Sequence, residues 1–126
     1  MIINARMETA EEKITFAESI RCRRCLIPAQ RYFEWTSGKG EKQKYALEPV
    51  TEELTYLAGL YRHEKEGPAV VVLTRPAAPS VSGIHHRMPL ILKGTEAEKW
   101  LAPGEISQEW REKAAVEEMC CQPVLL

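Results

Sequence analysis

Residues 24–36 read RCLIPAQRYFEWT, and this stretch decides the fold class. Its two halves, 24–28 and 31–36, are short runs rich in β-branched and aromatic residues, which is typical of strands. The following SGKG at 37–40 is typical of a turn. The same strand pattern continues in four further segments: 43–48, 54–61, 69–75 and 84–92. Pro89 indicates that the last of these is an edge strand or contains a bend.

The flanks of this strand-rich middle carry helix signals. Residues 9–12 and 95–98 have the spacing of capping boxes, and Ser107 is suited to cap a third helix. A few short peripheral helices around a mixed or antiparallel sheet, or a barrel-like core, predict a single α+β domain over residues 1–126. The chain begins and ends on apolar runs, so we expect a domain that is incomplete at both ends. Exposed sheet edges would then leave room for a homodimer.

Charge is balanced overall but unevenly distributed. The 126 residues include 17 basic and 18 acidic side chains, which argues against a nucleic-acid binder held by bulk charge. Residues 21–45 nevertheless carry seven basic side chains against two acidic ones, and such a region can bind phosphates on a neutral protein. No apolar stretch approaches the roughly 20 residues of a membrane span, and no export signal is recognisable. We therefore expect no membrane association and a cytoplasmic location.

The four cysteines are too few for a disulfide scaffold and are expected to be reduced thiols. Cys22 and Cys25 form a C-x-x-C pair, whereas Cys120 and Cys121 are adjacent and would diverge on a strand. Zinc sites of this type need a second pair at matching spacing. A metal site is therefore the weaker reading, and we predict neither a metal nor a cofactor.

Glu34 is the most informative polar residue because it stands between Phe33 and Trp35. Alternation along a strand places Tyr32 and Glu34 on one face and the two flanking aromatics on the other. One of these pairs must then occupy an environment that opposes its polarity. An acid held against aromatic surface is a usable general acid and base. The plain alternative is an outward-facing glutamate on an edge strand.

Two further pairs of polar residues share strand faces. His85 and His86 are adjacent, so on a strand they would point to opposite faces and only one could enter a given pocket. Arg87 lies on the His85 side, which makes an acid/base group beside a phosphate clamp plausible. Alternatively, both histidines are surface residues without a functional role. Arg6 stands in the same way two residues beyond Asn4.

Five blocks, in chain order between Ile3 and about Val124, resemble the SOS-response-associated peptidase family. This family traps abasic sites in single-stranded DNA as a covalent protein–DNA cross-link, so the resemblance implies abasic single-stranded DNA as the partner and a role in DNA damage. The blocks are Ile3-Asn-Ala-Arg-x-Glu-Thr9, Arg24-Cys-Leu-Ile-Pro-Ala29, Tyr32-Phe-Glu-Trp35, Ala58-Gly-Leu-Tyr61 and Ile84-His-x-Arg-Met-Pro-Leu-Ile-Leu92.

The resemblance implies roles for six residues. Asn4 matches the active-site asparagine that orients the reacting terminus, and Glu34 matches the acid proposed to assist proton transfer and sugar ring opening. His85 matches the family's acid/base in ring opening and cross-link reversal. Arg6 and Arg87 match phosphate-binding positions of the family, and Trp35 matches a base-stacking position. Cations together with an aromatic ring are the usual combination in proteins that bind single-stranded nucleic acid.

The chain departs from the family at the nucleophile. In the family, an N-terminal cysteine exposed by removal of the initiator Met condenses with the abasic aldehyde through its amine and thiol, giving a thiazolidine. Here residue 2 is Ile2, so we expect Met1 to be retained and no 1,2-aminothiol to form. A DNA-binding half-site without the covalent chemistry is the resulting prediction, with nucleoid-associated activity if the source is bacterial.

Two other functions compete with this reading. A non-catalytic single-stranded nucleic-acid-binding module would use the same basic and aromatic residues. A peptidase, which the family name suggests, needs a nucleophile, but Ser80, Ser82 and Cys25 lack a recognisable partner pattern.

Overall fold

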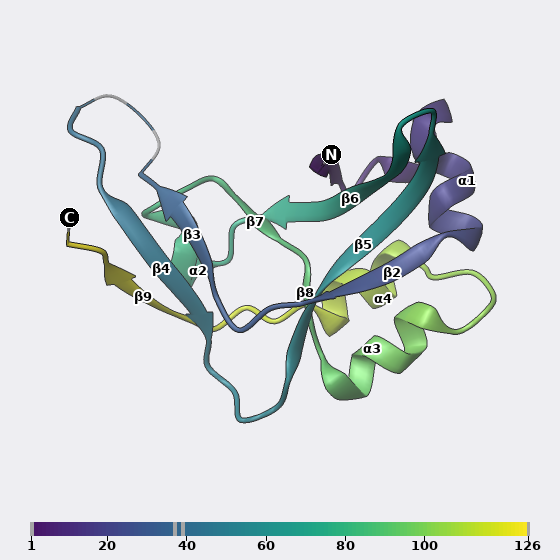
Figure 1. The fold of residues 1–126 in the computed structure, drawn as a ribbon. Helices are drawn as coiled ribbons and strands as arrows, with labels where there is room; N and C mark the ends of the chain where they lie inside the picture. Colours follow the sequence, from purple (N-terminus) through teal and green to yellow (C-terminus); the bar gives the residue numbers. More distant parts are fainter. Residues whose placement is uncertain (1, 37, 39, 126) are drawn as a thin grey trace.

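The computed structural model describes residues 2–36, 38 and 40–125, which form two sheets with short helices (Figure 1). In the larger sheet, β1 is parallel to β6, and the order is β1-β6-β5-β2 with β7 beside β6 and β8 beside β5. The smaller sheet is antiparallel, in the order β3-β4-β9. The strands of the larger sheet are β1 (Ile2–Arg6), β2 (Arg24–Pro28), β5 (Thr55–Glu64), β6 (Gly67–Pro76), β7 (Arg87–Pro89) and β8 (Ile91–Lys93). Those of the smaller sheet are β3 (Tyr32–Trp35), β4 (Lys44–Pro49) and β9 (Met119–Pro123).

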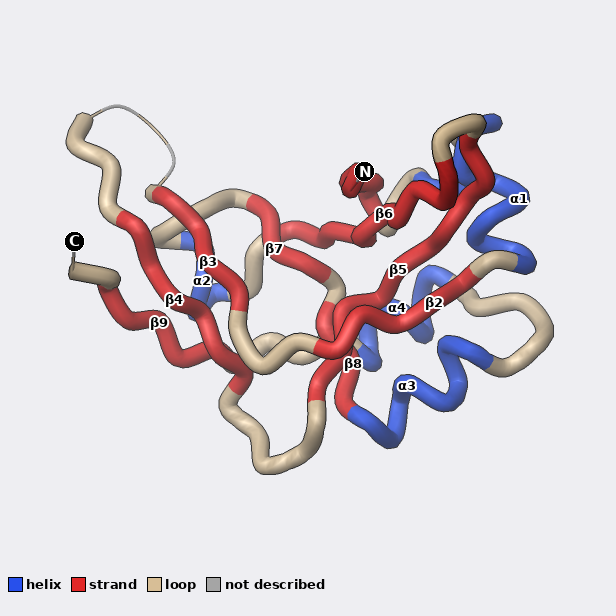
Figure 2. Tube along the Cα trace, in the orientation of Figure 1, coloured by secondary structure: helices blue, strands red, loops and turns tan. Residues whose placement is uncertain are grey.

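Three helices gather on one side of the larger sheet (Figure 2). They are α1 (Ile14–Cys22), which follows the short turn η1 (Ala10–Glu12), α3 (Gly94–Leu101) and α4 (Gln108–Ala114). The fourth helix, α2 (Pro79–Ser82), contacts β9 of the smaller sheet. None of the helices described is long and apolar enough to span a bilayer.

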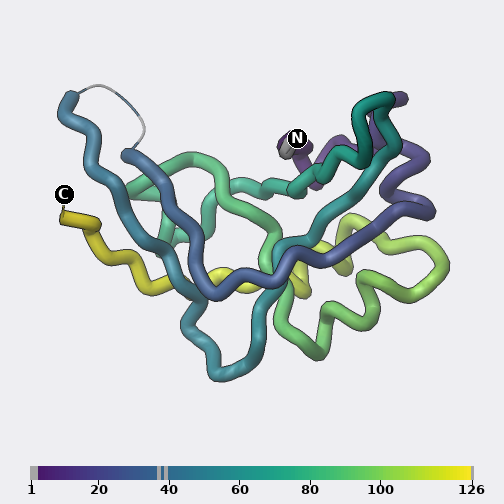
Figure 3. Tube along the Cα trace, viewed as in Figure 1, coloured from purple at the N-terminus to yellow at the C-terminus, as the bar shows by residue number. Residues whose placement is uncertain are grey.

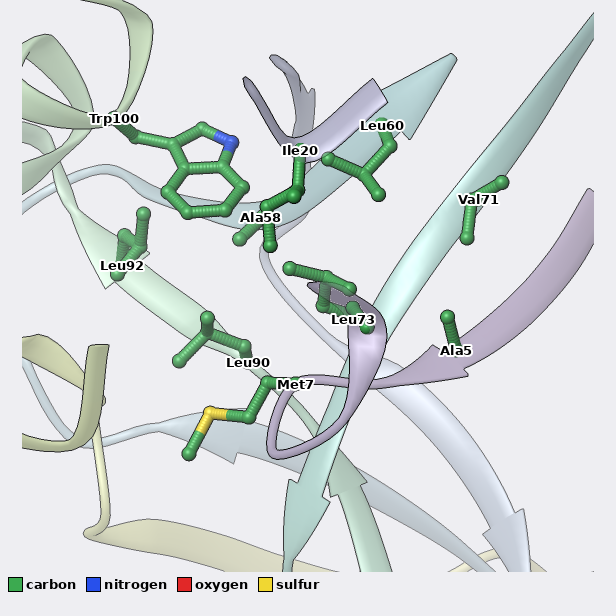
Figure 4. Close-up of a cluster of buried hydrophobic side chains, with 11 residues drawn as sticks. Ala5, Met7, Ile20, Ala58, Leu60, Val71, Leu73, Leu90, Leu92 and Trp100 are labelled. Carbon is green, nitrogen blue, oxygen red and sulfur yellow. The ribbon is translucent and has the colours of Figure 1, made fainter. Parts of the chain in front are cut away.

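The main core lies between the larger sheet and these three helices (Figure 4). Ala5, Leu60 and Leu73 point from neighbouring strands toward Trp100 of α3, and all four side chains are buried. The Trp100 indole Nε1 donates a hydrogen bond to the carbonyl oxygen of Cys25 at 2.9 Å. Because side chains alternate along a strand, the neighbours of Ala5 must point away from this core.

A second core joins the two sheets. Leu47 and Met119 of the smaller sheet form a buried cluster with Met88 and Ile91, which come from β7 and β8. Tyr32 of β3 packs against the same cluster. The two sheets thus diverge from a shared apolar base, with the β3–β4 hairpin on one side and the N-terminus on the other, as the chain trace shows (Figures 1 and 3).

The predicted α+β class with a strand-rich sheet and a few short helices is confirmed. Ser107 caps α4 as predicted, since its hydroxyl accepts the Trp110 backbone N–H at 3.0 Å. Both predicted capping boxes are wrong. The helix that follows residues 9–12 begins at Ile14, and the Thr9 side chain makes no capping hydrogen bond. The helix α3 begins at Gly94, so Thr95 lies inside it and does not cap it. The predicted turn at 37–40 falls partly outside the described residues.

The predicted strand over 84–92 is split into β7 and β8 by Leu90. The Leu90 backbone N–H donates to Leu73 on β6, while its carbonyl accepts from Ala58 on β5. The chain therefore crosses between two strands at the position after Pro89, as the proline suggested. β7 also begins later than predicted, at Arg87, so His85 and His86 lie in the loop before it.

Candidate functional site

β1 presents Asn4 and Arg6 on the sheet face opposite the helices. Both side chains are exposed, whereas Ala5 between them is buried in the main core. A shallow hollow of about 420 Å³ runs beside this strand, with Asn4, Arg6 and Lys13 among its lining residues. An amide and two cations at the rim of an open hollow can bind an anionic ligand.

Arg87 is anchored where β1, β6 and β7 meet. Its Nη1 and Nη2 donate to the two carboxylate oxygens of Glu8 at 2.6 and 2.9 Å, a bidentate ion pair. Nη2 also donates to the backbone oxygen and the hydroxyl of Thr74 at 2.9 and 3.0 Å. The hydrogen bonds from Arg87 hold the pKa of Glu8 below its usual value, and Arg6 adds a smaller effect in the same direction.

His85 is held by the backbone of Arg87. The Arg87 N–H donates to His85 Nδ1 at 3.1 Å, and the Arg87 carbonyl oxygen lies 3.3 Å from the same nitrogen. Because the amide is a fixed donor, the neutral ring carries its proton on Nε2.

The two histidines do not diverge as the strand reading predicted. Their rings stack, with centroids 4.6 Å apart and planes 22° from parallel. The reason is that both residues lie in the loop before β7, where strand alternation does not apply. His85 is half-buried and His86 is exposed.

Glu34 follows the predicted alternation on β3. Its side chain is half-buried on the same face as Tyr32, while Phe33 and Trp35 are 50% and 44% exposed on the other face. Although β3 is an edge strand, Glu34 therefore does not point outward with the aromatic residues. Its Oε1 accepts the backbone N–H of Trp35 at 3.0 Å, and its register partner on β4 is Tyr45.

Tyr32 was not singled out by the sequence pattern. Within the described residues its buried hydroxyl has no hydrogen-bond partner. Burial raises the pKa of Tyr32 well above its ordinary value, and the Glu34 carboxylate raises it further. A neutral phenol beside a carboxylate is the resulting arrangement.

The exposed face of β3 carries an aromatic surface formed by Phe33 and Trp35. The Lys44 ammonium lies 4.9 Å from the centre of the Phe33 ring, in a cation–π contact. Exposed rings next to a cation can stack bases and contact phosphates.

The structure gathers part of the predicted set at one place. Arg6 is the register partner of Thr74, which binds Arg87, and His85 is bound to the Arg87 backbone. Asn4 lies two residues along the same face of β1.

Glu34 and Trp35 belong to the other sheet, and the second core links the two groups. Tyr32 packs against a cluster that contains Ile84 and Met88, the residues that flank the His85–Arg87 segment. Sequence reasoning missed Glu8 and Thr74, although Glu8 continues the two-residue spacing of Asn4 and Arg6 and so carried a usable signal.

The serines considered as nucleophiles have structural partners. Ser80 Oγ donates to the Glu117 carbonyl at 2.7 Å and accepts the Met119 N–H, which ties α2 to β9. Ser82 Oγ donates to the Pro79 carbonyl oxygen. Among the residues described, no group of three or more His, Cys, Asp or Glu is placed to hold a metal ion.

Comparison with known proteins places this arrangement in a family. The model for the SOS response associated peptidase (SRAP) family matches residues 1–125. The chain belongs to the SRAP family. The predicted resemblance is therefore confirmed, and the match covers both sheets and both halves of the candidate site.

Several relatives of this SRAP chain carry names that state an activity. The abasic site processing protein YobE of Bacillus subtilis is 32% identical over 108 residues, covering 81% of this chain and 49% of the relative. The abasic site processing protein HMCES of Gallus gallus is 32% identical over 129 residues, covering 82% of this chain and 38% of the relative. This chain thus spans at most about half the length of these relatives.

The fold is shared with solved structures. A crystal structure of a protein from Bacteroides thetaiotaomicron superimposes with a TM-score of 0.82 at 29% identity, covering 97% of this chain and 58% of that one. A phage-related protein from Bordetella bronchiseptica gives a TM-score of 0.76 at 26% identity, covering 98% of this chain and 63% of that one.

Proposed function

We propose that this SRAP chain binds single-stranded DNA at abasic sites and acts on the lesion sugar. The observation that carries the proposal is the convergence of Arg6, Thr74 and Arg87 beside His85. The names of the relatives supply the substrate, an abasic site.

A phosphate contact is assigned to Arg6, which is exposed. The Arg87 guanidinium already holds Glu8 and Thr74, so Arg87 is assigned the orientation of His85 through its backbone instead of the phosphate contact that the resemblance implies. Trp35 and Phe33 provide the stacking surface for neighbouring bases.

Acid/base work is assigned to Glu34 and His85. Opening the abasic sugar removes one proton from the C1′ hydroxyl and delivers one to the ring oxygen, so one group must act as base and the other as acid. His85 is assigned to this work because the Arg87 backbone N–H binds Nδ1 and thereby orients the ring. Asn4 is proposed to orient the lesion from β1.

The peptidase activity in the family name is not assigned to the serines considered as nucleophiles. The hydroxyls of Ser80 and Ser82 are committed to backbone carbonyls.

The first test uses two single-stranded oligonucleotides of one sequence, of which one carries an abasic site. We expect a shifted band on native gels, stronger for the abasic strand. A denaturation-resistant band on the abasic strand would show in addition that an amine or thiol of this chain captures the aldehyde. Absence of any native shift would contradict DNA binding.

Chemistry is tested by the rate at which an alkoxyamine labels the opened abasic aldehyde in the complex. Glu34→Gln should slow labelling by at least about tenfold while DNA affinity stays within about twofold, because only proton transfer is removed. Glu48→Gln, an exposed position on β4, is the matched control and should change neither quantity. Equal loss of labelling and affinity in Glu34→Gln would count against an acid/base role.

A second candidate function is a single-stranded nucleic-acid-binding module without chemistry, favoured by the exposed Phe33–Trp35 surface and Lys44. Such a module would bind intact and abasic strands equally, because phosphate neutralisation does not depend on the sugar. Equal affinities for the two oligonucleotides, together with salt dependence, would select it.

A further inference from the structure

A hollow on the helix side of the larger sheet does not include the residues of the candidate DNA site. It measures about 700 Å³ and is lined by residues of α1, α4 and the segment between α3 and α4, among them Ile20, Ile106, Trp110 and Arg111. It shares no lining residue with the hollow beside Asn4 and Arg6. A ligand here would therefore use residues other than those of the proposed function.

Arg111 forms the floor of this hollow and is incompletely paired. Its side chain is fully buried. Nη2 donates to Gln108 Oε1 at 2.6 Å and to Glu11 Oε2 at 2.9 Å. Among the residues described, Nε and Nη1 have no acceptor. A buried guanidinium with unmet donors costs free energy that an incoming anion can recover.

Neighbouring charges make the surroundings more positive. The Arg24 guanidinium is close enough for Arg111 to lower the pKa of Arg24, in addition to the larger effect of burial. Arg24 itself is satisfied by backbone carbonyls, including those of Trp100 and Ala102. Arg21 and Lys99 also line the hollow, so its cations outnumber its carboxylates.

The remaining wall is apolar and partly aromatic. Ile20 and Ile106 line it together with Trp110, whose ring lies nearly parallel to that of buried Trp100 at 6.4 Å. A ligand that joins an oxyanion to a flat apolar group would fill both parts. The ion pair of Glu11 with Arg111 is the interaction that a ligand can most easily displace, because half of the Glu11 side chain is exposed to water.

We propose that this hollow binds an aryl oxyanion, a carboxylate or a phosphate monoester, whose charged group replaces Glu11 on Arg111. The ligand's additional oxygens supply acceptors that Arg111 lacks, and its ring packs against Trp110 and Ile106. Gln108 stays bound to Nη2 and fixes the guanidinium.

The test measures thermal unfolding of the full chain with phenyl phosphate, benzoate, inorganic phosphate or sodium chloride at equal ionic strength. At about ten times the dissociation constant, an aryl oxyanion should raise the midpoint by roughly 4 °C or more. Phenyl phosphate and benzoate distinguish the two oxyanion classes. No shift with either ligand beyond that with sodium chloride would overturn the proposal.

Two variants locate the effect. Glu11→Gln removes the competing carboxylate and should tighten ligand binding by about fivefold. Binding becomes tighter because the ligand no longer has to displace a half-exposed ion pair. Arg111→Met should abolish the ligand-induced shift without lowering the ligand-free midpoint, because an apolar side chain of similar length avoids the unmet donors.

Lys113→Gln on the exposed side of α4 is the matched control and should behave like the parent chain. A ligand shift that persists in Arg111→Met, or that falls equally in Lys113→Gln, would contradict the site. Weaker binding by Glu11→Gln would show that Glu11 belongs to a structural pair, and the displacement would be wrong. These outcomes do not depend on DNA binding, so the proposal and the proposed function fail separately.

Discussion

Aromatic residues are placed in opposite ways on the two sheets. Trp100 of α3 is completely buried against the larger sheet, and its indole N–H donates to backbone carbonyls of that sheet. The smaller sheet leaves Phe33 and Trp35 about half exposed on its edge strand, next to Lys44. In the first case the rings contribute to folding, whereas in the second they remain available to a ligand.

This difference separates stability from function within one domain. The larger sheet has helices on one face and presents Asn4 and Arg6 on the other, so a rigid core supports the site from behind. The smaller sheet contributes Glu34 on its inner face and the aromatic surface on its outer face. Substitutions in the two sheets should therefore affect different measurements.

The largest expected effect is on stability and comes from the larger sheet. Trp100→Ala removes a fully buried indole and two hydrogen bonds, and should lower the free energy of unfolding by about 3–5 kcal/mol. Urea unfolding followed by circular dichroism measures it. Leu101→Ala, at an exposed neighbouring position, is the control and should change stability by less than about 0.5 kcal/mol. Similar losses in both variants would contradict the assigned core.

A smaller, pH-dependent effect is expected where the larger sheet meets the site. Arg87 lowers the pKa of Glu8 below its ordinary value of 4.5, so the pair stabilises the fold fully above that pH. Its contribution is lost as the pH falls through the lowered pKa of the folded state. Glu8→Gln should cost about 1 kcal/mol at pH 7, a modest value because 30% of the Glu8 side chain is exposed.

The check is urea unfolding of both proteins at pH 7 and at pH 3. The difference between the parent chain and Glu8→Gln should shrink at the lower pH. Glu109→Gln, which breaks the exposed pair with Lys113, is the control and should show little difference at either pH. A difference that grows on acidification would reverse the sign and refute the assignment.

The strands and their faces could be predicted from the sequence because both depend on local patterns. The 24–28 strand has the predicted bounds, and the alternation around Glu34 correctly separates it from Phe33 and Trp35. Side-chain alternation needs only two neighbouring residues, so it survives even on a four-residue edge strand.

The arrangement around Arg87 and His85 could not be predicted in this way. Arg87 meets Glu8 across 79 residues of chain, and that contact depends on the parallel pairing of β1 with β6. The stacked histidines lie in the loop between α2 and β7, where the His85 N–H donates to the Val81 carbonyl and the His86 carbonyl accepts from Ala77. The local sequence pattern identifies the residue types, but it does not predict which distant residues they contact.

The smallest effect on stability, and a clear one on binding, is expected at the outer face of the smaller sheet. Trp35→Ala removes a ring that is already 44% exposed, so the free energy of unfolding should change by less than about 0.5 kcal/mol. Loss of one stacked base should nevertheless weaken single-stranded DNA binding by roughly 5- to 100-fold, with intact and abasic strands affected alike. Fluorescence anisotropy with both oligonucleotides measures this loss.

Val50→Ala is the control, since Val50 is 56% exposed and lies outside the β3 aromatic surface, and it should bind normally. If Trp35→Ala instead destabilised the fold and left DNA affinity intact, the aromatic surface would have a structural role and the contrast between the two sheets would fail.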